Sequence, residues 1–121
     1  MADDLRIHLG EPLETFGPRF AAAWARAEAG DLDAARAERH VSFESFASFA
    51  SVMTPKRLEL LRHLHRNPTP SIRALAGALR RDYRRVHDDV EALSAAGLID
   101  RQPEGLRADY ERLRIDAVVS I

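Results

Sequence analysis

Apolar residues recur every three to four positions in three consecutive segments of the chain, which is the period of an α-helix with one buried face. The first segment follows Thr54, an N-cap residue that precedes Pro55, and it ends at Asn67. The second and third segments follow Ser71 and Asp82, which are also N-cap residues. The sequence therefore predicts three short helices. Their expected buried positions are Leu58, Leu61, Leu64, Ile72, Leu75, Ala76, Leu79, Val86, Val90 and Leu93.

A β-hairpin is expected after the third helix. Gly97 stands where a left-handed residue closes a helix, and Leu98 is the apolar residue that folds back in a Schellman motif. Every second position of residues 113–121 is apolar, as on a half-buried strand, and residues 98–101 are the expected antiparallel partner. Residues 102–105, QPEG, have the chemistry of a turn between the two strands.

Residues 1–53 predict a strand, a long helix, a second strand and a short helix. Alternating apolar residues at positions 5–9 predict the first strand, and a helical stripe runs from Leu13 to Gly30. Residues 39–43 predict the second strand, and the spacing of residues 46–53 predicts the short helix. Two strands joined through a helix can pair in parallel, but an isolated two-stranded sheet is marginal in water. We expect the C-terminal strand to complete the sheet, within the same chain or across a dimer.

Composition indicates a small protein without covalent cross-links. A chain of 121 residues fits one compact domain or a domain with an appendage. It has no cysteine, which excludes disulfides and thiolate metal sites. No apolar run approaches the roughly 20 residues that cross a bilayer, and the acidic start MADD lacks the basic region of a signal peptide. We therefore expect a cytoplasmic protein with no membrane partner.

Charge is divided unevenly along the chain. The net charge is −1, but residues 1–53 hold five basic and nine acidic residues, a net charge of −4. Residues 54–115 hold thirteen basic and nine acidic residues, a net charge of +4. A basic half beside an acidic half indicates that the basic half meets a polyanion such as nucleic acid.

Three helices followed by a β-hairpin form the winged helix-turn-helix arrangement. Residues 54–116, with TPKRLELLRHL, VEALSAAGLI and YERLRID, resemble small prokaryotic winged-helix transcriptional regulators of the MarR-like kind. The segment HVSFESFASFASVMTPKRLELL looks like a group of regulators described as antitoxin-like DNA-binding proteins. The resemblance implies a double-stranded DNA partner and a homodimer. The expected fold is α+β and mainly helical, with a winged helix-turn-helix domain at 54–121 and a strand-helix-strand extension at 1–53.

By position, the recognition helix of this resemblance is residues 82–96, and basic residues gather at its start. Arginine binds guanine O6 and N7 with two hydrogen bonds, or binds a phosphate, and an aspartate accepts from the cytosine amino group. An alternative is a solvated helix start with an ordinary ion pair between Arg84 and Asp88. The elements around the helix favour the DNA interpretation. The residues expected to face the major groove are Arg81, Arg84, Arg85, His87 and Asp88.

Four further residues belong to the predicted DNA contacts. Tyr83 lies at the edge of the apolar face, where core packing is slightly favoured over a phosphate contact by its hydroxyl. Ser71 is expected mainly to cap the second helix, with a hydroxyl that can also donate to a phosphate. Arg101 and Arg107 flank the turn of the predicted wing.

Enzyme chemistry is not expected. The five histidines come without an H-E-x-x-H motif, a glycine-rich phosphate loop or a serine nucleophile elbow. Glu59 and His63 are one helical turn apart, but two ligands without a third are more often a surface pair than a metal site. The sequence therefore predicts neither a metal nor a cofactor.

Two functions stay open from the sequence. The first is a sequence-specific DNA-binding regulator, a dimeric repressor of its own operon. The second is an antitoxin or another interaction module that neutralises a partner protein. Residues 1–53 hold six of the eight aromatic residues, which indicates either a dimerisation and partner-binding surface or simply this segment's own core.

Overall fold

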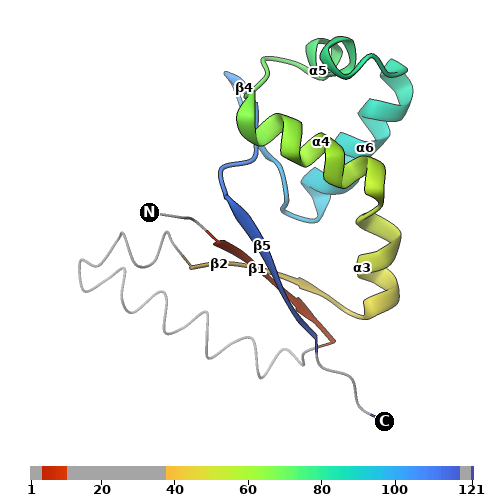
Figure 1. The fold of residues 1–121 in the computed structure, drawn as a ribbon, viewed down its shortest axis with the longest axis vertical. Coiled ribbons are helices and arrows are strands. Elements are labelled where there is room, and N and C mark those ends of the chain that lie inside the picture. The colour runs from red at the N-terminus through yellow and green to blue at the C-terminus, as the bar shows by residue number, and fades with distance from the viewer. Residues whose placement is uncertain (1–3, 11–37, 118–120) are drawn as a thin grey trace, which may run out of the picture. The chain divides into compact units, whose positions relative to one another are not determined.

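The structure is a computed structural model that describes residues 4–10, 38–117 and 121. It is an α+β protein, with helices gathered in one part of the chain and a parallel sheet in another (Figure 1). The long helix predicted from Leu13 to Gly30, with the aromatic residues Phe16, Phe20 and Trp24, lies outside the described residues.

The chain divides into two compact units. The sheet unit is Met1–Phe49 with Tyr110–Ile121, and the helical unit is Ala50–Asp109. Helix α3, Phe46–Val52, joins the two in sequence. The sequence analysis placed the C-terminal strand in the predicted domain at 54–121. In the structure that strand belongs to the sheet unit, because it pairs with the first strand of the chain.

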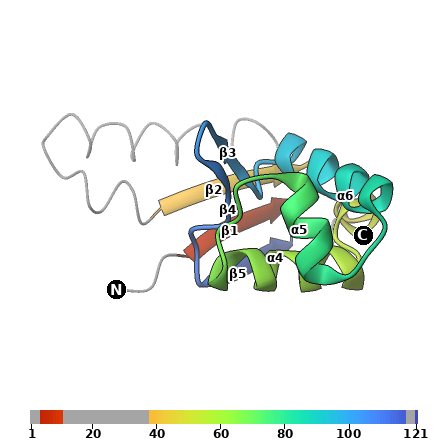
Figure 2. The ribbon, with the colours of Figure 1, turned by 90° about the horizontal axis from the view of Figure 1, so that it is seen from above.

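The sheet unit contains three parallel strands. They are β1 (Asp4–Leu9), β2 (Glu38–Phe43) and β5 (Arg112–Ala117), and β1 lies between the other two (Figure 2). The predicted parallel pairing of the two N-terminal strands is confirmed. The C-terminal strand completes the sheet within the same chain, which is one of the two arrangements that the sequence left open.

The two faces of the sheet differ in polarity. On one face, Leu5, Ile7 and Leu9 of β1 are at most 2% exposed. On the other, His8 is buried, and its Nε2 atom lies 2.7 Å from Nδ1 of His40 on β2. One of these two ring nitrogens must therefore carry the proton that the other accepts.

Strand β5 does not have the half-buried pattern that its alternation predicted. Leu113 is partly buried, but Ile115 is 50% exposed and Ala117 is exposed. The reason is that β5 is an edge strand of the described sheet, with β1 on one side only.

The helical unit follows the predicted order of elements. Each of the expected N-cap residues Thr54, Ser71 and Asp82 accepts from the backbone N–H three residues further on. These caps satisfy donors that have no partner within the helix, so they fix where each helix begins. The elements are α4 (Pro55–Arg66), α5 (Ile72–Leu79), α6 (Tyr83–Ala95), β3 (Asp100–Gln102) and β4 (Gly105–Arg107).

Leucines and valines from all three helices form the core of this unit. The predicted stripe of α4 is slightly rotated in the structure, because Leu60 is fully buried while Leu58 is only partly buried. Ile72 and Leu79 of α5 are also only partly buried. The buried core residues of the three helices are Leu60, Leu61, Leu64, Leu75, Ala76, Val86, Val90 and Leu93.

The end of α6 is the predicted Schellman motif. Gly97 has a φ of 84° and donates its N–H to the Ser94 carbonyl over 3.0 Å. Leu98 donates to the Leu93 carbonyl over 2.8 Å, and both leucines are fully buried. The chain therefore leaves α6 in a fixed direction toward the hairpin.

The hairpin has a different partner from the one predicted. Strand β3 pairs with β4 on the other side of the Pro103-Glu104 turn, and not with residues 113–121. Two hydrogen bonds then tie Leu106 of β4 to Thr69, which precedes α5. The short hairpin is thus anchored to the start of the helix pair.

Gly105 is expected to be essential for that anchoring. Its φ is 140°, and a Cβ atom there would lie 2.3 Å from the Thr69 carbonyl oxygen. Gly105→Ala should lower the free energy of unfolding by more than about 1 kcal/mol in urea denaturation. Gly77→Ala is the matched control, because a Cβ at this helical position meets nothing within 4 Å. It should raise stability by about 0.5–1 kcal/mol, and equal effects of the two changes would contradict this anchoring.

Candidate nucleic-acid interface

A tight turn of three residues sets the position of α6 relative to α5. Its first residue, Arg80, has a φ of 54°, a left-handed conformation that arginine seldom adopts. The N–H groups of Arg80 and Arg81 close α5 on the carbonyls of Gly77 and Ala76. Asp82 then starts α6 by accepting from the Arg85 N–H. A left-handed non-glycine residue costs about 1–2 kcal/mol, so the surrounding contacts must hold this turn in place.

An ion-pair cluster, here called the Asp89 bridge, supplies such contacts. It consists of Asp89 of α6, Arg57 of α4 and Arg81 of the turn. Arg57 Nε donates to Asp89 Oδ1 over 2.9 Å, and Arg81 Nη2 donates to Asp89 Oδ2 over 2.7 Å. The three side chains are only 13–20% exposed. Arg57 also donates to the carbonyls of Ser51 and Val52, so the bridge connects three helices and the turn.

The Asp89 bridge gives Arg81 a role that the sequence did not predict. Arg81 was expected in the major groove, but its guanidinium group is engaged by a carboxylate and is largely covered. Its Nη1 atom is buried and has no hydrogen-bond partner among the residues that the structure describes. Arg81 therefore acts as a structural residue. The overlooked signal was Asp89 itself, an acidic residue that directly precedes Val90 of the apolar stripe. Asp89 is buried, and a buried carboxylate requires a cation nearby.

Arg84 and Arg85 occupy the first turn of α6 and remain exposed. Neither makes an ion pair or side-chain hydrogen bond with any other residue that the structure describes. The alternative pair between Arg84 and Asp88 does not form, since Asp88 lies 3.7 Å from His87 instead. Two guanidinium groups thus add their charge to the positive end of the α6 dipole.

Tyr83 lies on the surface, so the favoured interpretation as a core residue was wrong. Its side chain is 43% exposed, and the guanidinium carbon of Arg73 lies 5.0 Å from the ring centre. The ring of His87 lies 6.0 Å away, one helical turn along α6. Tyr83 therefore links α5 to α6 through a cation–π contact while much of its side chain stays exposed.

The hairpin arginines are exposed but have carboxylate partners. Arg101 donates to Glu91 of α6 over 2.7 Å, and Arg107 lies 3.9 Å from Asp109. The hydrogen bond from Arg101, together with its positive charge, lowers the pKa of Glu91. Both pairs are about half exposed, so they exchange readily with another anion.

The predicted contact residues fall into groups. Tyr83, Arg84, Arg85, His87 and Asp88 lie on the solvent side of α6, and Arg101 joins this group through Glu91. Ser71 caps α5 as predicted, by accepting from the Ala74 N–H. No hydrogen bond or ion pair between described residues joins Ser71 or Arg107 to the group on α6.

Within residues 4–10, 38–117 and 121, no three His, Asp or Glu side chains gather in an arrangement that holds a metal ion. None of the described helices has the length and apolar character needed to span a membrane.

Removal of the Asp89 carboxylate is expected to destabilise the helical unit strongly. Asp89→Asn leaves two largely covered guanidinium groups without a counter-charge, and should cost about 3–5 kcal/mol in urea unfolding. Asp88→Asn, the adjacent exposed position, is the control and should change stability by no more than about 0.5 kcal/mol. If both variants unfolded at the same urea concentration, the Asp89 bridge would not be the constraint described above.

The contact between α6 and the hairpin should depend on pH. The folded pKa of Glu91 is lower than that of a free glutamate, so its stabilising contribution is full above the ordinary pKa. The contribution is lost as pH falls through the lowered value. A carbon-detected NMR titration of Glu91 should show this lowered pKa, and Arg101→Ala should raise it. An unchanged pKa in the variant would argue against the hydrogen bond.

Comparison with known proteins adds one finding. The family model HVO_A0114 matches residues 52–115, which is just over half of the chain. The match begins at Val52, the last residue of α3, and ends within β5, so it includes the helical unit from Val52 onward together with its hairpin. A search of curated proteins and a search of solved structures each found no match. The chain belongs to the HVO_A0114 family.

Proposed function

We propose that this protein is a transcriptional regulator that binds double-stranded DNA through α6. One observation carries the proposal. Arg84 and Arg85 lie on the first turn of α6, where they are exposed and have no ion-pair partner among the described residues. The Asp89 bridge fixes the same helix on its buried side. A rigid helix with free guanidinium groups at its N-terminal turn suits entry into a major groove.

The order of elements supports a winged helix-turn-helix unit. In this proposal α5 and α6 are the helix pair, α6 is the recognition helix, and the β3–β4 hairpin is the wing. The hydrogen bonds between Thr69 and Leu106 anchor the hairpin beside the start of α5. The excess of basic residues over 54–115 supplies the charge that attracts a polyanion.

The arginines of this unit divide into three roles. Arg84 and Arg85 contact guanine edges or phosphates directly. Arg81 positions α6 through Asp89 and does not contact DNA. Arg101 and Arg107 exchange their carboxylate partners, Glu91 and Asp109, for DNA phosphates when the hairpin contacts the sugar-phosphate backbone. Tyr83 and Ser71 are exposed residues whose hydroxyl groups can donate to phosphates. The carboxylate of Asp88 can accept from a cytosine amino group.

The proposed regulator acts as a dimer in the cytoplasm. Two α6 helices then enter successive major grooves about 34 Å apart on one face of a pseudopalindromic site. Binding at such a site upstream of its own gene blocks transcription.

Loss of the free arginines should weaken binding and relax its specificity. In fluorescence anisotropy on the upstream duplex, Arg84→Ala and Arg85→Ala should each cost about 1–3 kcal/mol for a lost base contact. Discrimination against a scrambled duplex should fall at the same time. The free energy of unfolding should stay unchanged, since neither side chain has a partner among the described residues.

The matched control is the double variant Arg62→Ala with Arg66→Ala, compared with the double variant Arg84→Ala with Arg85→Ala. Both arginines of the control are exposed on α4, so the control removes the same charge away from α6. This variant should retain the discrimination between upstream and scrambled duplex. If it lost specificity as strongly as the α6 variants did, bulk charge and not α6 would explain binding.

A further inference from the structure

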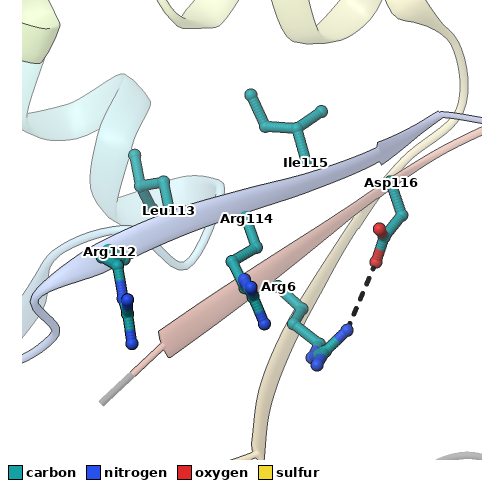
Figure 3. A pocket seen from close by; sticks show the side chains of 6 residues that line it. All are labelled: Arg6, Arg112, Leu113, Arg114, Ile115 and Asp116. Atoms are coloured by element: carbon teal, nitrogen blue, oxygen red, sulfur yellow. Dashed lines mark ion pairs between the residues drawn. The ribbon is translucent and has the colours of Figure 1, made fainter. Parts of the chain in front are cut away.

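Strand β5 has one hydrogen-bonded neighbour in the described sheet, β1, so its other edge is unpaired. An unpaired edge offers a row of backbone N–H and C=O groups to another strand. Parallel strands are usually covered, yet Ile115 at the middle of β5 is 50% exposed. An open pocket of about 630 Å³ runs along this strand, lined by Arg6, Arg112, Leu113, Arg114, Ile115 and Asp116 (Figure 3).

The side chains of β5 separate by chemistry onto the two faces of the sheet. Arg112, Arg114 and Asp116 extend to one side, and Leu113 and Ile115 extend to the other (Figure 3). Charges on an edge strand usually discourage pairing. Here the charges have opposite signs two positions apart, so their effect depends on the register of the partner.

The intramolecular partners leave these charges incompletely balanced. Asp4 of β1 serves both Arg112, at 2.9 Å, and Arg114, at 3.5 Å. Asp116 Oδ2 lies 3.7 Å from Arg6 Nη1 and 3.9 Å from Nδ1 of the buried His8, and the side chains of Arg6 and Asp116 are 41% and 50% exposed. Arg114 therefore shares its carboxylate, and Asp116, with half of its side chain exposed, is accessible to a cation of another chain.

We propose that β5 pairs antiparallel with β5 of a second copy of this chain, with Ile115 opposite Ile115 across a two-fold axis. This register places Arg114 of each copy directly opposite Asp116 of the other, and Leu113 opposite Ala117. Opposite charges in direct cross-strand positions attract, and the apolar side chains meet on the other face. The pairing joins two three-stranded sheets into one and covers the exposed Ile115.

Other registers of the same two strands are less favourable. A shift by one residue places Ile115 opposite either Arg114 or Asp116 and mixes the polar and apolar faces. A shift by two residues places either Arg114 opposite Arg114 or Asp116 opposite Asp116, and like charges in direct opposition destabilise. The register with Arg114 opposite Arg114 also pairs Arg112 with Asp116 twice, but its central pair is repulsive. In the register centred on Ile115, every directly opposed pair of charged residues is attractive.

This inference supplies the interface for the dimer in the proposed function, and it is tested without DNA. Sedimentation equilibrium of the full chain should show a dimer, and Ile115→Lys should weaken the dimer about tenfold or more. Circular dichroism should show that this variant is folded, because the position is half exposed in the single chain. The control Arg62→Asp, an exposed charge change on α4, should leave the dimer intact.

A charge-exchange experiment tests the register itself. Arg114→Asp and Asp116→Arg should each give monomers, because each homodimer then opposes like charges twice. An equimolar mixture of the two variants should form a heterodimer, since both cross-strand pairs are again opposite in charge. General damage to the fold would not be repaired by mixing.

Three results would overturn the pairing: a monomeric wild type at tens of micromolar, a dimer dissociation constant that Ile115→Lys leaves unchanged, or folded variants that stay monomeric when mixed. A monomeric wild type would instead favour another occupant of this edge, such as a strand of a different protein. Dimers that form as expected but do not bind the upstream duplex would refute only the proposed function. DNA binding without restored heterodimers would refute only the β5 interface.

Discussion

The Asp89 bridge is the interaction on which the helical unit depends. One carboxylate on α6 holds a guanidinium group from α4 and another from the turn before α6, and all three side chains are largely covered. Such a cluster adds little to the free energy of unfolding compared with apolar residues of the same shape. The loss of one member lowers that free energy strongly, because a covered charge is left without a partner. Its value lies in geometry, because it fixes the strained turn at Arg80 and the direction in which α6 leaves it.

This constraint separates arginines that are close in sequence into different tasks. Arg81 is used to hold the helix, whereas Arg84 and Arg85, three and four positions later, stay exposed without a partner among the described residues. A recognition helix needs both kinds, since a base contact made by a loosely held helix loses its geometric specificity. The hairpin is held in a comparable way, by Thr69 on one side and by the bond between Arg101 and Glu91 on the other.

Local features of the helical unit could be predicted from the sequence, and long-range features could not. The three N-caps and the Schellman motif at Gly97 rest on hydrogen bonds between residues at most five positions apart, so residue type and spacing determine them. The predicted hairpin partner of β3, residues 113–121, was wrong. Both that segment and β4 come after the Pro103-Glu104 turn, and both place apolar and polar residues in alternation, so the pattern alone does not distinguish them. The pairing of β5 with β1 depends on the whole chain. Its hydrogen bond from Arg112 to Asp4 joins residues 108 positions apart. The role of Arg81 was missed because only the packing of the unit shows which cations meet Asp89: Arg81 is eight positions away from it, and Arg57 is thirty-two.

The presentation of Arg84 and Arg85 to a DNA duplex by a rigidly held α6 is the central proposal. The most direct measurement is a fluorescence anisotropy titration of the wild-type protein on its upstream region, beside a scrambled duplex, at 50 and 200 mM salt. With some 6–10 phosphates neutralised per dimer, affinity should fall about 10³–10⁵-fold between these concentrations, and the upstream duplex should bind more tightly at both. Equal binding of the two duplexes, or binding that does not change with salt, would contradict the claim.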